Sequence, residues 1–300
     1  MRYKIWTLIL LFFSINFLYS QQEVNYALYK RHFNIINPGV AGVGESTYMN
    51  LSIRTQWTGI KNAPETQAFS YSVPYRNKKV GLGFTVINDK ISIERQTQLF
   101  ADFSYQLDFN RDTSLYLGLK GGGNLFRLLG DDASIYDDNG LIIDPEIRTF
   151  SRFLPNVGVG IYLENHDKFF LSLSVPRILN TKRFKEQDGQ ITTATDRPHY
   201  FTSAGIHLHT SQDWTITPSF LWAVVKDAPS SFVCDLGFSF QNVFDFGVQY
   251  TNSQSLGGNA FFKLSENLQF GYAYNTPINT QLRASALATH EILLRVTLNN

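Results

Sequence analysis

Apolar and polar residues alternate along most of the chain after residue 46. Leu99, Ala101, Phe103, Tyr105 and Leu107 occupy every second position, with mostly polar residues between them. Successive side chains of a β-strand point to opposite faces, so this period indicates a strand with one apolar face. It recurs about fourteen times, at 49–57, 69–73, 80–86, 99–107, 115–119, 157–163, 169–175, 200–208, 214–222, 232–238, 244–250, 260–264, 268–274 and 292–298. The pattern therefore predicts an all-β protein of about fourteen strands.

Charged residues inside these segments fall on the face opposite to the apolar row. They are Arg54, Asp102, Lys120, Asp235, Asp245, Lys263, Glu291 and Arg295. A lysine or arginine on the lipid face at mid-membrane costs about 2–4 kcal/mol, so a membrane barrel requires this separation. A β-sandwich would also collect its charges on one face, and the charge pattern alone leaves both folds open.

The connections between the predicted strands distinguish these two folds. Short connections alternate with longer ones, and the longer ones are 58–64, 88–95, 125–156, 176–198, 223–230, 251–257 and 275–288. Outer-membrane barrels have short periplasmic turns and longer extracellular loops, whereas a sandwich has no reason to alternate in this way. We therefore expect residues 47–300 to form a transmembrane antiparallel up-and-down β-barrel of about fourteen strands.

The first residues indicate the compartment. Arg2 and Lys4 precede an apolar stretch from Ile5 to Tyr19, and the small residue Ser20 ends it. This arrangement is typical of a secretory signal peptide, and the apolar run is shorter than the roughly 20 residues of a spanning helix. We expect a cleaved signal peptide at 1–20. Residues 21–46 would then lie in the periplasm or as a plug inside the barrel.

Composition agrees with export to a membrane. Aromatic residues make up 15% of the chain and charged residues 17%, compared with about 25% charged residues in a usual soluble domain. The 26 basic and 25 acidic residues nearly balance, which indicates no nucleic-acid partner. The single cysteine, Cys234, cannot form an internal disulfide and is too few for a thiolate metal site.

One group of residues leaves a hydrolase open. Ser203 shares the predicted lumen face with His199 and His207, so a Ser–His lipid hydrolase at the barrel wall is an alternative. The chain has no G-x-S-x-G motif, and polar lining of the lumen explains the same residues more simply. We therefore expect no enzyme, no catalytic residue and no cofactor.

The longest predicted loop carries an acidic cluster at 131–146. Asp137, Asn139, Gly140 and Glu146 fall at spacings used by an EF-hand loop, but its first ligand position would be Ile135, which cannot coordinate calcium. An ordinary surface loop is the simpler interpretation, and we predict no metal site.

Several short motifs follow one another along the chain. They are Asn37-Pro38-Gly39-Val40-Ala41-Gly42, Arg54-Thr55-Gln56-Trp57-Thr58-Gly59, Ala63-Pro64-Glu65-Thr66-Gln67, Lys79–Gly83, Asn88–Lys90, Gly118–Gly122, Pro155–Gly160 and His290–Ile292. In order and spacing they resemble the PorP/SprF membrane proteins of type IX secretion, with their Asn-Pro-x-x-Ala-Gly, R-x-Q-W-x-G and A-P-x-T-Q elements. The resemblance covers nearly the whole mature chain, although Asn299-Asn300 replaces the aromatic residue common at barrel C-termini.

The resemblance implies an outer-membrane barrel of Bacteroidetes that assists the export of a secreted protein, often a large adhesin, and holds it at the cell surface. The secreted protein would carry a C-terminal sorting domain. Further implied partners are a periplasmic peptidoglycan-associated lipoprotein of the secretion machinery and outer-membrane lipid, with a link to gliding motility.

Trp57, Gly59, Ala63, Pro64 and Gln67 are the expected partner-binding residues, because they combine aromatic, turn-forming and polar groups at one rim. A rigid turn with a tryptophan anchored at the membrane interface would explain them equally well. The competing function is passive transport of a hydrophobic solute. An N-terminal plug with an apolar pocket beside it would favour transport.

Overall fold

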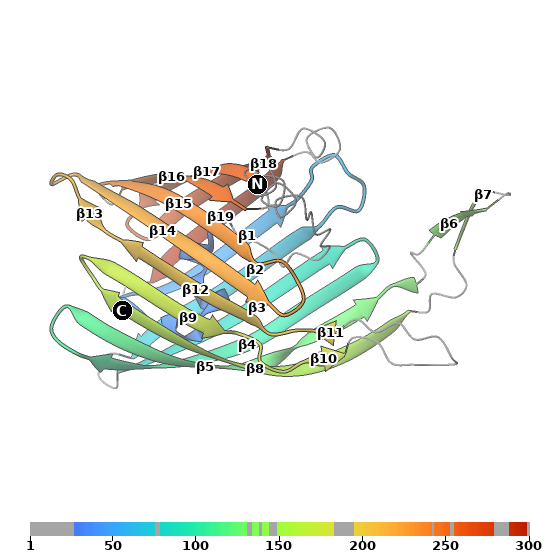
Figure 1. Cartoon of the computed structure of the whole chain (residues 1–300), viewed down its shortest axis with the longest axis horizontal. Helices are drawn as coiled ribbons and strands as arrows, with labels where there is room; N and C mark the ends of the chain where they lie inside the picture. Colours follow the sequence, from blue (N-terminus) through green and yellow to red (C-terminus); the bar gives the residue numbers. More distant parts are fainter. Residues whose placement is uncertain are drawn as a thin grey trace, which may run out of the picture.

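Fourteen antiparallel strands close into a ring in the described part of the computed structural model (Figure 1). The structure describes residues 27–75, 79–130, 134–137, 140–143, 149–182, 195–241, 243–252, 255–278 and 288–298. The strands of the ring are β1 (Thr47–Thr55), β2 (Glu65–Tyr75), β3 (Val80–Ile91), β4 (Glu94–Asp108), β5 (Thr113–Leu128), β8 (Phe150–Asn165), β9 (Phe169–Val175), β12 (His199–Ile206), β14 (Trp214–Val225), β15 (Ser231–Phe240), β16 (Phe244–Thr251), β17 (Ser255–Ser265), β18 (Leu268–Pro277) and β19 (Thr289–Leu298). The two-residue β13 (Leu208–His209) continues β12 and pairs with the same neighbour, β14.

The ring closes because its first and last strands pair. Thr47 of β1 lies opposite Leu298 of β19, and the pairing continues to Thr55 and His290. Every other ring strand pairs with its neighbours along the chain, which is the up-and-down arrangement. A closed ring satisfies backbone hydrogen bonds between strands and exposes no open sheet edge to lipid. The predicted barrel is confirmed, and the sandwich is excluded.

The two faces of the ring differ as the alternation predicts. Leu51, Ile53 and Leu119 are exposed on the outer face, whereas Arg54 and Lys120 are buried on the inner face. Cys234 is also on the exposed face. None of the described helices is long and apolar enough to cross a membrane.

The connections at the two ends of the ring are less regular than expected. β3 and β4 are joined by Ser92 and Ile93 alone, and β16 and β17 by residues 252–254, so the longer loops predicted at 88–95 and 251–257 are wrong. Strand pairing continues through polar residues, as where Asn88 lies opposite Thr97, because backbone hydrogen bonds do not require apolar side chains. Four connections remain long, and all four lie at the same end of the ring, called here the long-loop end. They are 56–64, 129–149, 176–198 and 278–288.

The wall of the ring is uneven in height. β5 and β8 have 16 residues each, more than the 9–11 that span a bilayer. Two further hairpins belong to connections at the long-loop end, and the first of them lies well beyond the ring (Figure 1). They are β6 (Ser134–Asp137) with β7 (Gly140–Ile143), and β10 (Thr181–Lys182) with β11 (Thr195–Asp196).

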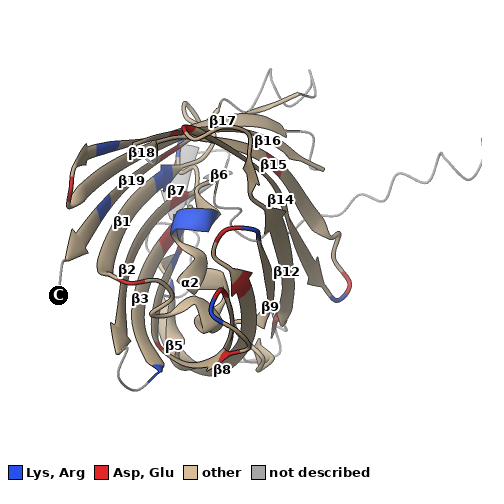
Figure 2. Cartoon of the chain, turned by 90° about the vertical axis from the view of Figure 1, so that its left-hand side faces the viewer, with Lys and Arg blue, Asp and Glu red and all other residues tan. Residues whose placement is uncertain are grey.

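Residues 27–46, called here the inner segment, lie inside the ring (Figure 2). They form the short helices η1 (Tyr29–Arg31), α2 (Phe33–Ile36) and η2 (Pro38–Val40), and then lead into β1. Most of their side chains are buried against the inward-facing residues of the strands. The predicted signal peptide at 1–20 lies outside the described residues.

Candidate functional site

The inner segment contacts one side of the wall at three glycines. Gly81, Gly118 and Gly160 lie on β3, β5 and β8 and face the lumen. A Cβ atom at Gly81 would overlap the carbonyl group of Ala41, and one at Gly118 would overlap the backbone of Pro38 and Gly39. The wall therefore lacks side chains where the backbone of the inner segment lies against it.

Asn37 forms hydrogen bonds that stabilise this contact between the inner segment and the wall. Its Nδ2 donates to the carbonyl of Ile161 at 2.9 Å and to Ser172 Oγ at 2.7 Å, both on the wall. Its Oδ1 accepts from the backbone N–H of Gly39 at 2.8 Å, which begins η2. Pro38 follows at the first helical position, where its missing N–H costs no hydrogen bond. The Asn-Pro-Gly motif thus makes a short turn and anchors it to two strands.

Further polar groups of the wall satisfy the backbone of the inner segment. Ser104 Oγ donates to the Ala41 carbonyl at 2.5 Å, and Ser174 Oγ donates to the Ile36 carbonyl at 2.7 Å. The N–H of Gly42 donates to Ser72 Oγ at 2.7 Å. These contacts lie on β4, β9 and β2, so the segment is attached around half of the ring.

Apolar side chains fill the lumen beside the helices. Phe33 packs edge-on against Tyr162 and Phe170, with ring centroids 5.8 and 6.0 Å apart. The same buried cluster includes Tyr29, Ile35, Ile36 and Val40 from the inner segment and Ala68, Ile87, Tyr116, Leu221 and Val233 from the wall. The barrel therefore has a hydrophobic core inside it, which fills this part of the lumen.

Two buried polar contacts accompany this core. Lys120 Nζ lies 2.8 Å from Asp102 Oδ1 on the neighbouring strand and donates to the Asn34 carbonyl at 3.1 Å. His32 Nδ1 lies 3.3 Å from Ser70 Oγ. Burial, aided by the positive charge of Arg295, lowers the pKa of His32 to about 3, so the imidazole is neutral at physiological pH.

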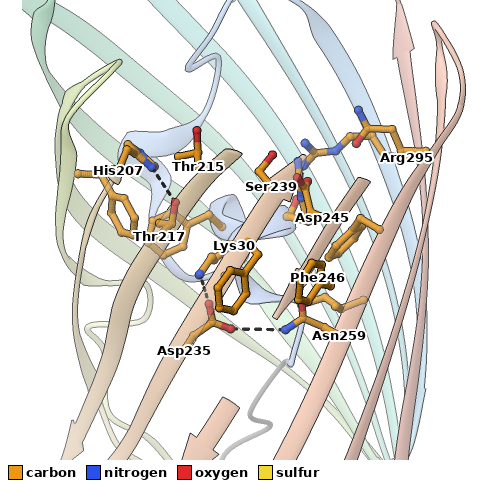
Figure 3. Close-up of a pocket in the computed structure, with 18 of the residues that line it drawn as sticks. Lys30, His207, Thr215, Thr217, Asp235, Ser239, Asp245, Phe246, Asn259 and Arg295 are labelled. Carbon is orange, nitrogen blue, oxygen red and sulfur yellow. Dashed lines mark hydrogen bonds and ion pairs between the residues drawn. The ribbon is translucent and has the colours of Figure 1, made fainter. Parts of the chain in front are cut away.

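Beside this core the lumen holds a cavity of about 610 Å³, bordered by Phe33, Tyr162 and Phe170 on one side and by strands β14–β19 on the other (Figure 3). η1 borders this cavity and reaches the wall through ion pairs: Lys30 pairs with Asp235 of β15, and Arg31 pairs with Asp245 of β16. Burial lowers the pKa of Lys30, and the Asp235 carboxylate opposes that effect. The inner segment is thus held by close backbone contact on one side and by charged side chains on the other.

A third cation completes this side of the cavity. Arg295 of β19 donates from Nε to Asn50 Oδ1 at 2.7 Å and from Nη2 to the Arg31 carbonyl at 2.5 Å. In Figure 3 its side chain lies beside Asp245. The sequence pattern placed Asp235, Asp245 and Arg295 on the inner face but did not reveal that they meet around the inner segment.

The predicted partner-binding residues lie in and next to the β1–β2 loop at the long-loop end. Thr58 N–H donates to the Ala288 carbonyl at 3.2 Å, and Ser92 N–H donates to the Asn62 carbonyl at 3.2 Å, so the loop is attached to both neighbours. Trp57 is 45% exposed, and Gly59 and Gln67 are exposed. Ala63 is half-buried and Pro64 is buried.

The hydrolase alternative gains no support from the geometry. Ser203 Oγ donates to the Phe220 carbonyl at 2.6 Å. His199 Nδ1 lies 3.0 Å from the Arg197 carbonyl, and His207 Nδ1 lies 3.1 Å from Thr217 Oγ1. Each of the three side chains therefore has a partner other than the Ser–His contact that the mechanism needs.

The acidic cluster at 131–146 lies largely outside the described residues. Its described parts are β6 and β7, in which Asp137 pairs with Gly140 across a tight hairpin. Among the described residues, no group of three or more His, Cys, Asp or Glu side chains is placed to hold a metal ion.

Solved structures of outer-membrane barrels share this fold. The CymD monoaromatic hydrocarbon channel superposes with a TM-score of 0.51 at 13% identity, covering 88% of this chain and 91% of that chain. The Acinetobacter baumannii outer membrane protein Omp33 gives a TM-score of 0.45 at 10% identity, over 86% of this chain and 100% of that one. The P. putida toluene transporter TodX gives 0.42 at 8%, over 88% and 92%.

The sequence of the chain is similar to a more specific group of proteins than its fold is. The family model described as type IX secretion system membrane protein PorP/SprF matches residues 18–296. No curated protein matches the chain.

Proposed function

The chain belongs to the PorP/SprF family of type IX secretion system membrane proteins, and from this premise we propose that it assists the export and surface attachment of a secreted protein. The secreted protein would be adhesin-like and carry a C-terminal sorting domain. The barrel would act without catalysis, by binding.

The filled lumen supports binding at a rim rather than passage through the barrel. The buried cluster around Phe33 and Phe170 occupies the lumen, and a polypeptide in transit would have to displace it. The long-loop end offers more surface than the short turns, and in outer-membrane barrels that end faces outward. A surface-attached partner would therefore contact the long-loop end.

The β1–β2 loop is our proposed contact site at that end. Trp57 and Ile60 are 45% and 42% exposed on a loop whose backbone is hydrogen-bonded to its neighbours. A rigid, exposed aromatic side chain loses little entropy on binding, and tryptophan is enriched among the residues that dominate interface energies. Gly59 and Gln67 would add polar contacts, while the buried Pro64 and half-buried Ala63 would shape the loop.

The short-turn end would face the periplasm and meet the rest of the machinery. We propose a peptidoglycan-associated lipoprotein of the secretion machinery as the partner there, and a role in gliding motility where the exported protein is an adhesin. Export of the chain itself would use the cleaved signal peptide at 1–20.

Deletion of the gene tests this proposal. Surface and medium proteomes of the deletion strain are compared with those of the parent and of a complemented strain. We expect at least one protein with a C-terminal sorting domain to leave the cell surface, and complementation to restore it. If every such protein keeps its location and amount, the proposed function is wrong.

One observation favours a second candidate, passive transport of a hydrophobic solute. The inner segment lies in the lumen with a cavity beside it, and one solved barrel of this fold is named a monoaromatic hydrocarbon channel. The cavity is lined by ion pairs as well as rings, which is less apolar than that function would require. Uptake of labelled toluene by proteoliposomes measures this transport. Uptake equal to that of empty liposomes would exclude the transport function.

A further inference from the structure

The cavity lies beside β15, where Gly237 leaves the inner face of the wall without a side chain. Gly237 of β15 lies on the inner face and lines the cavity. The nearest atoms to a Cβ at Gly237 would be 3.6 Å away, which is ordinary contact distance. At Gly118 the same atom would overlap the inner segment. Glycines thus admit the backbone of the inner segment on one side of the lumen, whereas at Gly237, beside the cavity, a side chain would fit in ordinary contact.

The charged groups that lie beside η1 in this cavity do not balance. Lys30, Arg31 and Arg295 contribute three cations, and Asp235 and Asp245 contribute two carboxylates. Each carboxylate pairs with one residue of η1, whereas Arg295 donates to two neutral oxygens. This cluster therefore carries one excess positive charge beside the cavity. An anionic group can bind there without displacing either ion pair.

The remaining charged groups of the cavity lie nearer its mouth. Lys263 pairs with Glu266 at 2.8 Å, and Asp167 belongs to the β8–β9 turn with His166. His209 Nε2 lies 2.9 Å from the Asp167 carbonyl. All of these belong to the short-turn end, so the cavity opens towards that end.

Aromatic rings line the cavity close to the charged cluster. Phe33 of the inner segment and Phe261 of β17 contribute to its surface, and the Arg31 guanidinium lies 4.8 Å from the centre of the Phe261 ring. A ligand bound here would meet a cation at one end and rings along its body. The volume of the cavity falls in the range of about 300–1,000 Å³ typical of small-molecule pockets.

We propose that this cavity binds a small anionic amphipathic molecule that enters from the short-turn end. Its carboxylate or phosphate contacts Arg295 and Arg31, and its apolar or aromatic body lies against Phe33 and Phe261. This site is separate from the proposed contact with a secreted protein at the long-loop end, and either can exist without the other.

Binding of matched probes to the purified protein in neutral detergent tests the proposal. Isothermal titration compares 3-phenylpropanoate, its neutral amide and the corresponding amine, which share one body. We expect the carboxylate to bind about tenfold more tightly than the amide, which corresponds to about 1.4 kcal/mol, and the amine to bind most weakly, because only the carboxylate forms charge-assisted hydrogen bonds with the cations. Equal affinities for the three probes, or no binding by the carboxylate, would overturn it.

Two further probes identify the head group and the need for a body. Phenethyl phosphate should bind at least as well as the carboxylate if phosphate is the natural head. Inorganic phosphate alone should bind much more weakly than phenethyl phosphate, because it leaves the rings uncovered. Equal affinity for these two phosphates would contradict the amphipathic part of the proposal.

Variants test the assigned residues. Arg295→Gln should weaken 3-phenylpropanoate about tenfold, through loss of a charge-assisted contact. Asp245→Asn should strengthen it several-fold, because it raises the excess positive charge of the cluster. Lys79→Gln is the control: Lys79 lies at the same end, pairs with Asp108 outside the cavity, and its loss should leave affinity unchanged. Weaker binding to Asp245→Asn, or equal effects of Arg295→Gln and Lys79→Gln, would overturn the assignment.

Discussion

Gly118 of β5 lies directly against Gly39 of the inner segment, so that a Cβ atom at Gly118 would overlap the backbone nitrogen of Gly39. The two residues are far apart in the chain, and each lies in a short glycine-containing motif. Their contact shows how the Asn-Pro-Gly turn and the glycines of the strands form one structural unit. Gly81 and Gly160 repeat the arrangement on the strands nearby.

A side chain at Gly118 should displace the inner segment. Gly118→Val places a Cβ atom where the backbone of Pro38 and Gly39 lies, and such overpacking costs about 1–3 kcal/mol. We expect a lower midpoint of urea unfolding in lipid vesicles and faster tryptic cleavage at Lys30 or Arg31. Gly121→Val is the matched control, because Gly121 lies on the same strand with nothing within 4 Å of its Cβ position. Equal loss in both variants would contradict the contact.

The pH dependence of stability should carry a contribution from His32. An unfolded histidine titrates near 6.5, whereas burial lowers the pKa of His32 to about 3. Between these values only the unfolded state takes up the proton. The contribution of His32 to the free energy of unfolding is therefore complete above about pH 6.5. It is lost as the pH falls from there towards 3, by at most about 1.4 kcal/mol per pH unit.

The variant His32→Gln isolates this contribution, because glutamine cannot titrate but can still hydrogen-bond Ser70. The unfolding free energy is measured at pH 7.5 and 4.5, and the parent should lose more than His32→Gln does. His166→Gln serves as control, since that side chain is 53% exposed. Identical pH dependence in the parent and His32→Gln would show that His32 is not buried as described.

The buried pair of Asp102 and Lys120 should show strong coupling. The two residues lie opposite each other on β4 and β5, with at most 2% of either side chain exposed. Asp102→Ala leaves a buried ammonium group without its carboxylate, which we expect to cost about 3–5 kcal/mol. The double variant Asp102→Ala with Lys120→Met should recover part of that loss in a double-mutant cycle. A double variant as unstable as the sum of the singles would argue against the ion pair.

Exposed side chains at the two ends of the barrel should differ in their effect on secretion. Trp57→Ala should reduce the surface amount of the partner protein several-fold at unchanged barrel abundance, because it removes the proposed aromatic contact. Phe109→Ala is the matched control: Phe109 is 65% exposed, in a turn at the opposite end. Immunoblots of surface-exposed partner measure both. A normal surface amount in Trp57→Ala would place the contact elsewhere.

Much of the wall could be predicted from alternation, and the interior could not. The parity of Asp102, Lys120 and Asp235 predicted their inward orientation, because period two is a local property of a strand. The contact of Gly118 with Gly39 joins segments distant in sequence, and a glycine within a strand has the same pattern whether space or backbone lies beside it. The cavity could not be predicted either, because it is the part of the lumen that the inner segment leaves empty.

The lengths of the loops could be predicted only where a strand ends at the same residue as its row of alternating apolar positions. At 88–95 the charged residues Asp89 and Lys90 indicated a loop, yet both belong to β3 and pair with Gln96 and Arg95 of β4. Polar residues can extend a hairpin beyond the membrane because the hydrogen bonds between strands are formed by the backbone and do not require apolar side chains. The motif at Asn37 marks the family resemblance in the sequence, but its position inside the lumen comes from contacts with β8 and β9.

Ion conductance across a planar bilayer tests the filled lumen most directly, since our account depends on a barrel that binds at its rim rather than conducting through its centre. Single insertions of the parent protein should give no sustained porin-like current steps, and Gly118→Val should give them more often. Stable open steps from the parent protein, in every insertion and at low voltage, would contradict the account.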